Sequence, residues 1–223
     1  MEDVVVFIVS TGPVGLAVAS CLSQRSVPYL IVECEDWSAS LWRRRAYDHV
    51  KLHLAKEFCA LPHMPCPAGT LTYMPKKEFV EYLDAYTERF GVKPRYCISI
   101  ESAACDEGAP WWFIVALDTV PAQILLTARF LVVATGESVV GVLPEVPGIE
   151  SFFGETMHSS TYKSGGLYAW KRVLVVSCGN FVMEIAYDLV IHGVDISIVV
   201  LSPVWIFIFN NIICEFMICV LFI

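Results

Sequence analysis

Two turns of the sequence, each lying between an apolar run and a helical pattern, contain the residues that could bind a phosphate group. In the first turn, the apolar residues 4–9 are followed by Ser10, Thr11, Gly12, Pro13, Val14 and Gly15. Such a turn leaves main-chain N–H groups free at the start of a helix, where the helix dipole also favours an anion. The pattern predicts a site for the pyrophosphate of a dinucleotide, and two such turns in one chain indicate redox chemistry.

The three glycine positions of a dinucleotide-binding turn have different tasks. The first permits the tight turn, the second admits the pyrophosphate, and the third lets the helix pack closely on the strand. Gly12 and Gly15 occupy the second and third positions, whereas Ser10 occupies the first. The next strand is expected at residues 29–32, and Glu33 after it can accept a hydrogen bond from a ribose hydroxyl. The alternative is an ordinary strand, turn and helix with small residues chosen for packing; the position of Glu33 favours nucleotide binding.

Five further runs point to a known family, and the last of them is more specific than a glycine-rich turn. They are SLWRRRAYD (40–48), KLHL (51–54), FCALPHMP (58–65), PKKEFVEYL (75–83) and FFGETMHSSTY (152–162). Together they resemble plant YUCCA-type flavin-containing monooxygenases, and the last run matches FxGxxxHxxxY, the identifying pattern of that family. The resemblance extends from about Val4 to Ser202 and ends there.

The resemblance implies FAD and NADPH as cofactors and O2 as a co-substrate. In the YUCCA branch the substrate is indole-3-pyruvate, which is converted to the auxin indole-3-acetic acid. The resemblance assigns residues 10–15 and Glu33 to the FAD pyrophosphate and ribose, and Leu41 with Trp42 to a segment along the same cofactor. Because the flavin carries the difficult chemistry, we assign no side chain as general acid or base. His53 lies near the position of an Asn beside the flavin in related monooxygenases, and a packing histidine is the alternative.

The second turn departs from the GxGxSG pattern that the family has at its NADPH site. Residues 172–176 are followed by Ser177, Cys178, Gly179, Asn180, Phe181 and Val182. Val182 puts a branched side chain where helix and strand should touch, and such overpacking costs about 1–3 kcal/mol if the backbone cannot shift. Leu201 stands where the family usually has an Arg for the 2′-phosphate, so a strong charge-assisted contact is lost. We therefore predict weak NADPH binding.

The order of elements predicts an α/β protein with two Rossmann-like dinucleotide-binding units, the first with an inserted β-meander and the second incomplete. We expect an FAD-binding domain at residues 1–148 and a partial NADPH-binding domain at residues 149–203. The expected elements of the first are a helix at 78–90, meander strands at 95–102, 111–117 and 124–126, and a last strand at 130–133. Before the apolar tail that begins at residue 204, the second should have only two strands, 172–176 and 196–200, and one helix.

Composition excludes several classes of protein. The 223 residues have a formal net charge of −8, so we expect no nucleic acid partner, because Arg43-Arg44-Arg45 is the one basic cluster. Nine cysteines without a CxxC pair form neither a zinc site nor a disulfide framework, and they argue against a disulfide reductase. We expect no metal. The N-terminus lacks the basic region of a signal peptide, and a reduced cytoplasmic setting fits.

Residues 204–223 form an apolar tail, interrupted by Asn210, Asn211 and Glu215. About 20 such residues can span a bilayer, which would anchor the chain in the endoplasmic reticulum membrane. However, Glu215 near the centre costs about 2.5 kcal/mol or more. We therefore expect a truncated or aberrant reading frame to be the source of this tail, with a membrane anchor and a strand that pairs with another copy as the alternatives. With truncation, we expect an impaired monooxygenase or a noncatalytic product that binds FAD at most.

Overall fold

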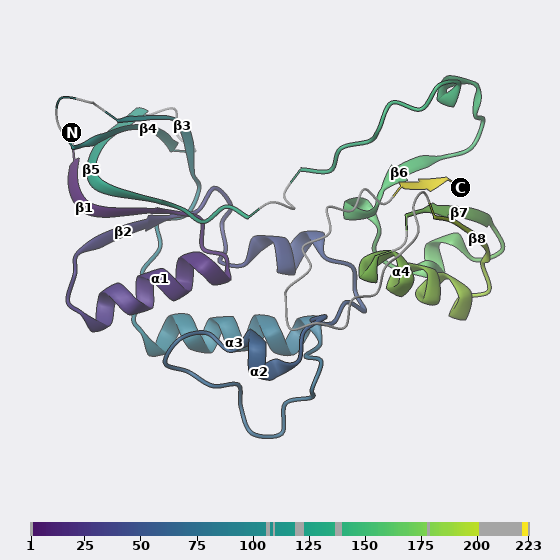
Figure 1. The fold of residues 1–223 in the computed structure, drawn as a ribbon, viewed down its shortest axis with the longest axis horizontal. Helices are drawn as coiled ribbons and strands as arrows, with labels where there is room; N and C mark the ends of the chain where they lie inside the picture. Colours follow the sequence, from purple (N-terminus) through teal and green to yellow (C-terminus); the bar gives the residue numbers. More distant parts are fainter. Residues whose placement is uncertain are drawn as a thin grey trace. The chain divides into compact units, whose positions relative to one another are not determined.

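The computed structural model describes residues 2–105, 108, 110–118, 123–136, 140–177, 179–200 and 220–222. The chain divides into two compact units. The first unit comprises Met1–Arg44 and Leu54–Val139, and the second comprises Arg45–His53 and Val140–Ile223. Figure 1 labels most of the strands and helices of both units.

A mixed five-stranded sheet forms the centre of the first unit. Its strands, in spatial order, are β2 (Tyr29–Val32), β1 (Glu2–Val9), β5 (Gln123–Val133), β4 (Trp112–Asp118) and β3 (Ile98–Cys105). β1 is parallel to both of its neighbours, whereas β4 is antiparallel to β5 and β3. The branched and aromatic residues of β1 suit a central strand that is covered on both faces, and Phe7 and Ile8 are fully buried there.

β5 corrects the sequence-based prediction of the meander. Separate strands were expected at 124–126 and 130–133, but β5 runs unbroken through both. Its first part pairs with β4 and its later part pairs with β1, so the meander continues the main sheet. Nothing in QILLTARFLVV ends a strand, because the run contains neither Pro nor Gly. The strand expected at 95–102 begins only at Ile98, since Arg95 makes an isolated parallel bridge to Val32.

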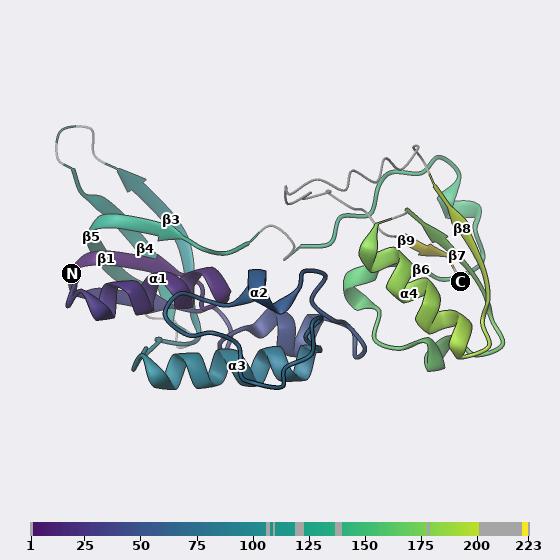
Figure 2. The same cartoon turned by 60° about the horizontal axis from the view of Figure 1, so that its bottom comes forward.

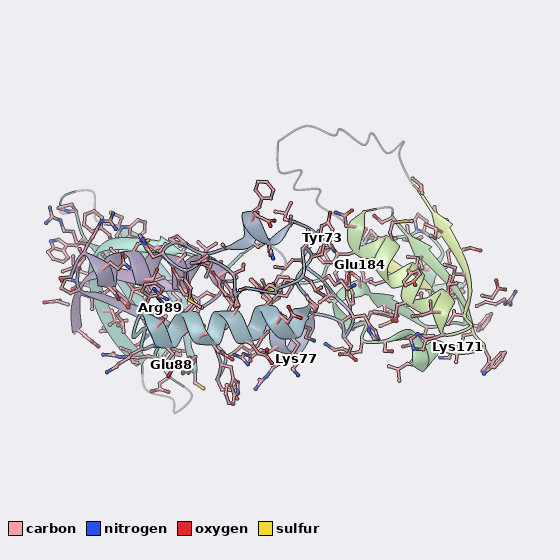
Figure 3. The ribbon with its side chains drawn as sticks, turned by 90° about the horizontal axis from the view of Figure 1, so that it is seen from below. Tyr73, Lys77, Glu88, Arg89, Lys171 and Glu184 are labelled. Atoms are coloured by element: carbon pink, nitrogen blue, oxygen red, sulfur yellow. The ribbon has the colours of Figure 1, made fainter. Side chains whose placement is uncertain are left out.

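Two helices of the first unit pack in succession below the parallel strands (Figure 2). α1 (Pro13–Gln24) contacts β1 and β2, and α3 (Lys76–Arg89) contacts α1. The buried face of α3 consists of Phe79, Tyr82, Leu83 and Tyr86, which recur at helical spacing. Lys77, Glu88 and Arg89 lie on its exposed side (Figure 3). The short helices η1 (Leu41–Arg45) and α2 (Lys56–Cys59) precede α3 in the chain.

The second unit contains a four-stranded sheet covered by one helix. Its strands, in spatial order, are β6 (Thr156–His158), β9 (Val220–Phe222), β7 (Arg172–Val176) and β8 (Asp195–Val199). β7 and β8 are parallel, and β9 is antiparallel to β6 and β7. α4 (Asn180–Ile191) packs on β7 and β8. The short helices of this unit are η2 (Ile149–Ser151), η3 (Ser159–Thr161) and η4 (Gly165–Tyr168).

Each unit thus has two parallel strands joined through a helix, and the predicted α/β class with two Rossmann-like units is confirmed. The prediction of only two strands before the tail is wrong, because β6 adds a third; β9 lies within the tail and is a fourth strand of this sheet. β9 comes from residues 220–222 of the apolar tail, whose remaining residues lie outside the described part of the chain. None of the helices within the described residues is both long and apolar enough to cross a membrane.

Candidate functional site

The first glycine-rich turn joins the end of β1 to the start of α1. Ser10 has a φ of 85°, in the left-handed region that favours glycine. Its N–H donates to the carbonyl oxygen of Val32 at 2.8 Å, which ties the turn to the end of β2. Ser10 therefore adopts the conformation that the first glycine provides in such a turn. A serine held there stores about 1–3 kcal/mol of backbone strain.

Gly12 and Gly15 are glycines for different reasons. A Cβ atom at Gly15 would lie 2.0 Å from the carbonyl oxygen of Ser10, so only glycine lets α1 approach the turn this closely. A Cβ atom at Gly12 would meet no neighbouring atom nearer than 3.9 Å. Packing therefore does not require glycine at position 12. The open side of Gly12 instead fits the close approach of a pyrophosphate to the backbone, just before Pro13 begins α1 and beside the exposed Val14.

Glu33 lies directly after β2 and is only 3% exposed. Its Oε2 atom accepts hydrogen bonds from the Thr11 N–H at 2.8 Å, the Thr11 hydroxyl at 2.8 Å and the Ser10 hydroxyl at 3.2 Å. Its Oε1 atom accepts from the Glu35 N–H at 3.3 Å and the Cys34 thiol at 3.4 Å. The structure therefore brings the carboxylate and the turn together at the carboxyl ends of β1 and β2, where nucleotides bind in this class of fold.

Two more segments adjoin this turn. The Ala39 N–H donates to the carbonyl oxygen of Thr11 at 3.1 Å, which anchors the segment leading to Leu41 and Trp42. The Trp42 ring meets the ring of Phe79 edge to face, with centroids 4.8 Å apart, so it is held on the buried side of α3. After β5, the Ala134 N–H donates to Val9 at 3.0 Å. The first unit thus gathers most of the residues predicted to contact FAD.

The second turn repeats the backbone of the first. Ser177 has a φ of 127°, and its N–H donates to the carbonyl oxygen of Val199 at 2.9 Å, as Ser10 does to Val32. Gly179 caps α4. Val182 is fully buried where a third glycine would stand, so the backbone accommodates its branched side chain. Asn180 and Phe181 are exposed, while Cys178 and Leu201 lie outside the described residues.

Sequence analysis missed a polar cluster along α4 in the second unit. The buried Tyr47 donates a hydrogen bond to Glu184, which projects from α4 (Figure 3). His53 Nε2 lies 3.4 Å from Glu184 Oε2 without hydrogen-bond geometry, and its ring packs on Phe181 with centroids 4.7 Å apart. His53, weighed as a flavin neighbour or a packing residue, packs within the second unit. The one sequence signal is Glu184 and Asp188, two acids one helical turn apart in an otherwise apolar helix.

Electrostatics in this cluster favour a protonated tyrosine beside an ionised carboxylate. Burial, together with the hydrogen bond and charge of Glu184, raises the pKa of Tyr47 far above the physiological range. Burial alone would raise the pKa of Glu184. The adjacent His53 and the hydrogen bond from Tyr47, together with the nearby Lys51, outweigh burial and hold the pKa of Glu184 below its ordinary value. The cluster holds residues 45–53 against α4.

The FxGxxxHxxxY run also has a structural role in the second unit. His158 Nδ1 accepts a hydrogen bond from the Ser160 N–H at 3.1 Å and caps η3. The fully buried Tyr162 donates to Asp188 of α4. A cavity of about 1030 Å³ in this unit is lined by residues near Phe152 and by the starts of β7 and β8. It contains none of the predicted site residues, because the turn lies at the other end of β7.

Comparisons with known proteins agree with these features. Residues 5–212 match the flavin-binding monooxygenase-like family. The chain is 51% identical over 204 residues to the probable indole-3-pyruvate monooxygenase YUCCA10 of Arabidopsis thaliana, covering 91% of this chain and 53% of that protein. It is 47% identical over 197 residues to the indole-3-pyruvate monooxygenase YUCCA1 of Oryza sativa subsp. japonica, covering 88% and 48%. The chain spans about half the length of these curated relatives.

A solved structure gives the same picture of the fold. The flavin-containing monooxygenase from Stenotrophomonas maltophilia superposes with a TM-score of 0.80 at 22% sequence identity. The match covers 91% of this chain and 59% of that one. At this identity the likeness bears on the fold alone, and it agrees with two Rossmann-like units.

Proposed function

The chain belongs to the flavin-binding monooxygenase-like family, and from that premise we propose that it provides the FAD-binding unit and part of the NADPH-binding unit of a flavin-dependent monooxygenase. One observation carries the proposal. Glu33 is buried at the end of β2 and faces a turn whose Gly12 is open to a ligand while Gly15 is packed against Ser10. Packing does not require a glycine at position 12, and a carboxylate lies where the ribose would bind. A dinucleotide-binding site requires both features.

Within this proposal, the residues of the first unit bind and orient the cofactor. The N–H groups at the start of α1 would hold the pyrophosphate, aided by the helix dipole. Glu33 would accept a hydrogen bond from the adenosine ribose, and Leu41 and Trp42 would lie along the cofactor. When bound, FAD supplies the redox and oxygen chemistry. The protein contributes position and exclusion of water, and none of the described side chains is assigned a proton-transfer role.

We propose indole-3-pyruvate and O2 as the substrates, with indole-3-acetic acid as the product. The names of the similar plant proteins support this substrate, since they are indole-3-pyruvate monooxygenases. We also propose that the second unit binds NADPH weakly. Ser177 keeps the turn in shape, but Val182 fills the place of the third glycine and the bulky Phe181 stands beside it. Slow reduction of the flavin would then limit turnover.

Two measurements on the purified full chain test the proposed function. The first is copurification of a yellow chromophore with a flavin absorption band, or binding of added FAD. The second is NADPH-dependent oxygen uptake with and without indole-3-pyruvate. Flavin binding with slow, substrate-dependent uptake is the expected result. Flavin binding without any uptake would favour a noncatalytic FAD-binding product, and absence of flavin binding would refute the assignment of the first unit.

A further inference from the structure

We infer that the hydroxyl groups of Ser10 and Thr11 occupy one oxygen of Glu33 and so leave a single carboxylate oxygen for the ribose of FAD. The inference rests on the proposed function, because it concerns how this site would bind its cofactor. It goes beyond that function because it states that the hydroxyls of Ser10 and Thr11 weaken the binding of FAD. The two residues are positioning residues, since they act through Glu33.

The first step is the number of donors that reach Oε2 of Glu33. The Thr11 N–H and the Thr11 hydroxyl both lie 2.8 Å away, and the Ser10 hydroxyl lies 3.2 Å away. A carboxylate has about four acceptor positions, about two on each oxygen, so three donors exceed the positions that Oε2 offers. Thr11 is fully buried, and water cannot replace Glu33 as the partner of its hydroxyl. A ribose hydroxyl that displaced Thr11 would leave a buried donor unpaired, which is unfavourable.

The other oxygen is less occupied. Oε1 of Glu33 accepts from the Glu35 N–H at 3.3 Å and from the Cys34 thiol at 3.4 Å. The first of these bonds is long for an N–H donor and the second uses a weak donor. A ribose presents two neighbouring hydroxyls, and a carboxylate with two open oxygens could accept both. In this chain Glu33 offers Oε1 alone.

Ser10 competes for the cofactor in a second way. The Gly12 N–H lies 3.4 Å from the Ser10 hydroxyl oxygen and donates to it. This N–H belongs to the open backbone that the pyrophosphate would approach. At 3.4 Å this bond is as long as those to Oε1, so the serine hydroxyl engages this donor only weakly, and its main effect is on the acceptor needed by the ribose. A glycine at position 10 would free both groups and would suit the φ of 85°.

The test compares affinities of the full chain and its variants for FAD, followed by quenching of flavin fluorescence. Thr11→Val removes the hydroxyl and keeps the shape, whereas Thr11→Ser keeps the hydroxyl and serves as the matched control. We expect Thr11→Val and Ser10→Gly each to bind FAD about tenfold more tightly, the effect of one hydrogen bond to a charged group. Thr11→Ser should match the unmodified chain, and thermal unfolding should show that all variants fold.

A second measurement uses FAD that lacks the 2′-hydroxyl of the adenosine ribose. It separates a specific effect on the ribose contact from a general change in protein stability, which would affect both ligands alike. The gain of Thr11→Val should vanish with this analogue, and Glu33→Gln combined with Thr11→Val should abolish the gain for FAD. If the unmodified chain binds FAD and Thr11→Val binds it no more tightly, the inference is overturned while the proposed function stands. If neither the chain nor any variant binds FAD, both are overturned.

Discussion

Tyr162, the last residue of the FxGxxxHxxxY run, donates a hydrogen bond to Asp188 of α4, and both side chains are buried. The Gly165 N–H donates to the same carboxylate oxygen at 2.7 Å. Burial and the neighbouring Asp188 charge raise the pKa of Tyr162 above the physiological range, so its hydroxyl remains a donor. Through Tyr162, the motif that identifies the family therefore attaches residues 152–162 to α4 within the second unit.

Replacing Tyr162 with Phe should destabilise the second unit by about 1–3 kcal/mol, because the buried Asp188 would lose a donor. Urea denaturation of the full chain, followed by far-UV circular dichroism, measures the change. Tyr187→Phe is the matched control, since that tyrosine lies on the same helix and is 70% exposed. Its effect should stay within about 0.5 kcal/mol. Equal effects of the two variants would contradict the structural role of Tyr162.

Gly12 and Gly15 should respond differently to alanine. Gly15→Ala should destabilise the first unit by about 1–3 kcal/mol or more, because the new Cβ would lie 2.0 Å from the Ser10 carbonyl oxygen. Gly12→Ala should change stability by no more than about 1 kcal/mol, since its φ of −67° suits alanine and the site is open. It should nevertheless lose FAD binding. Thermal unfolding and FAD titration of both variants check this, and retained FAD binding by Gly12→Ala would contradict the proposed pyrophosphate site.

The second unit should lose stability in acid through Glu184. Although burial opposes ionisation, the nearby His53 and the hydrogen bond from Tyr47 hold the pKa of Glu184 below 4.5, its ordinary value. A carboxylate with a lowered pKa in the folded state adds stability above the unfolded pKa, and that stability is lost as the pH falls below 4.5 through the folded pKa. Glu184→Gln should remove this part of the pH dependence. Unfolding free energies between neutral pH and acid should therefore converge for the two proteins; parallel curves would argue against the cluster.

The second unit should bind NADPH more weakly than micromolar. Val182 and Phe181 replace small residues of the turn, and neither side chain can offer a phosphate a donor. Titration of the purified chain with NADPH, followed by tryptophan fluorescence, measures the affinity. NADH is the matched control, because a site without a 2′-phosphate contact should not distinguish the two. Micromolar affinity, or clear preference for NADPH, would contradict this prediction.

Local patterns were sufficient to predict the strands on which the two glycine-rich turns depend. β2 was predicted at residues 29–32 and β7 at residues 172–176, and both strands have those bounds, because a glycine or proline signal or a polar residue flanks each apolar run. Glu33 was found from its distance to the turn. The role of Ser10 also follows from the pattern, since a turn of this kind needs a positive φ at its first glycine position.

Features that depend on residues far apart in the sequence could not be predicted. Tyr47 and Glu184 are 137 positions apart, and neither lies in a motif that indicates the other. β9 pairs with β6 and β7 through its backbone, which an apolar run alone does not reveal. Two strands were expected where the unbroken β5 lies, and Thr127 between them is buried and bonded to Asp3, far away in the sequence.

Residues 45–53 belong to the second unit, although the residues before and after them belong to the first. After recombination with a single crossover near residue 139, Tyr47 would come from one parent and α4 with Glu184 from the other. The hydrogen bond between Tyr47 and Glu184 would then join residues of different origin. Exchange of this unit between homologous genes would succeed only if both stretches were inherited together. Shuffled libraries built from such genes should accordingly show linked ancestry at these two distant positions.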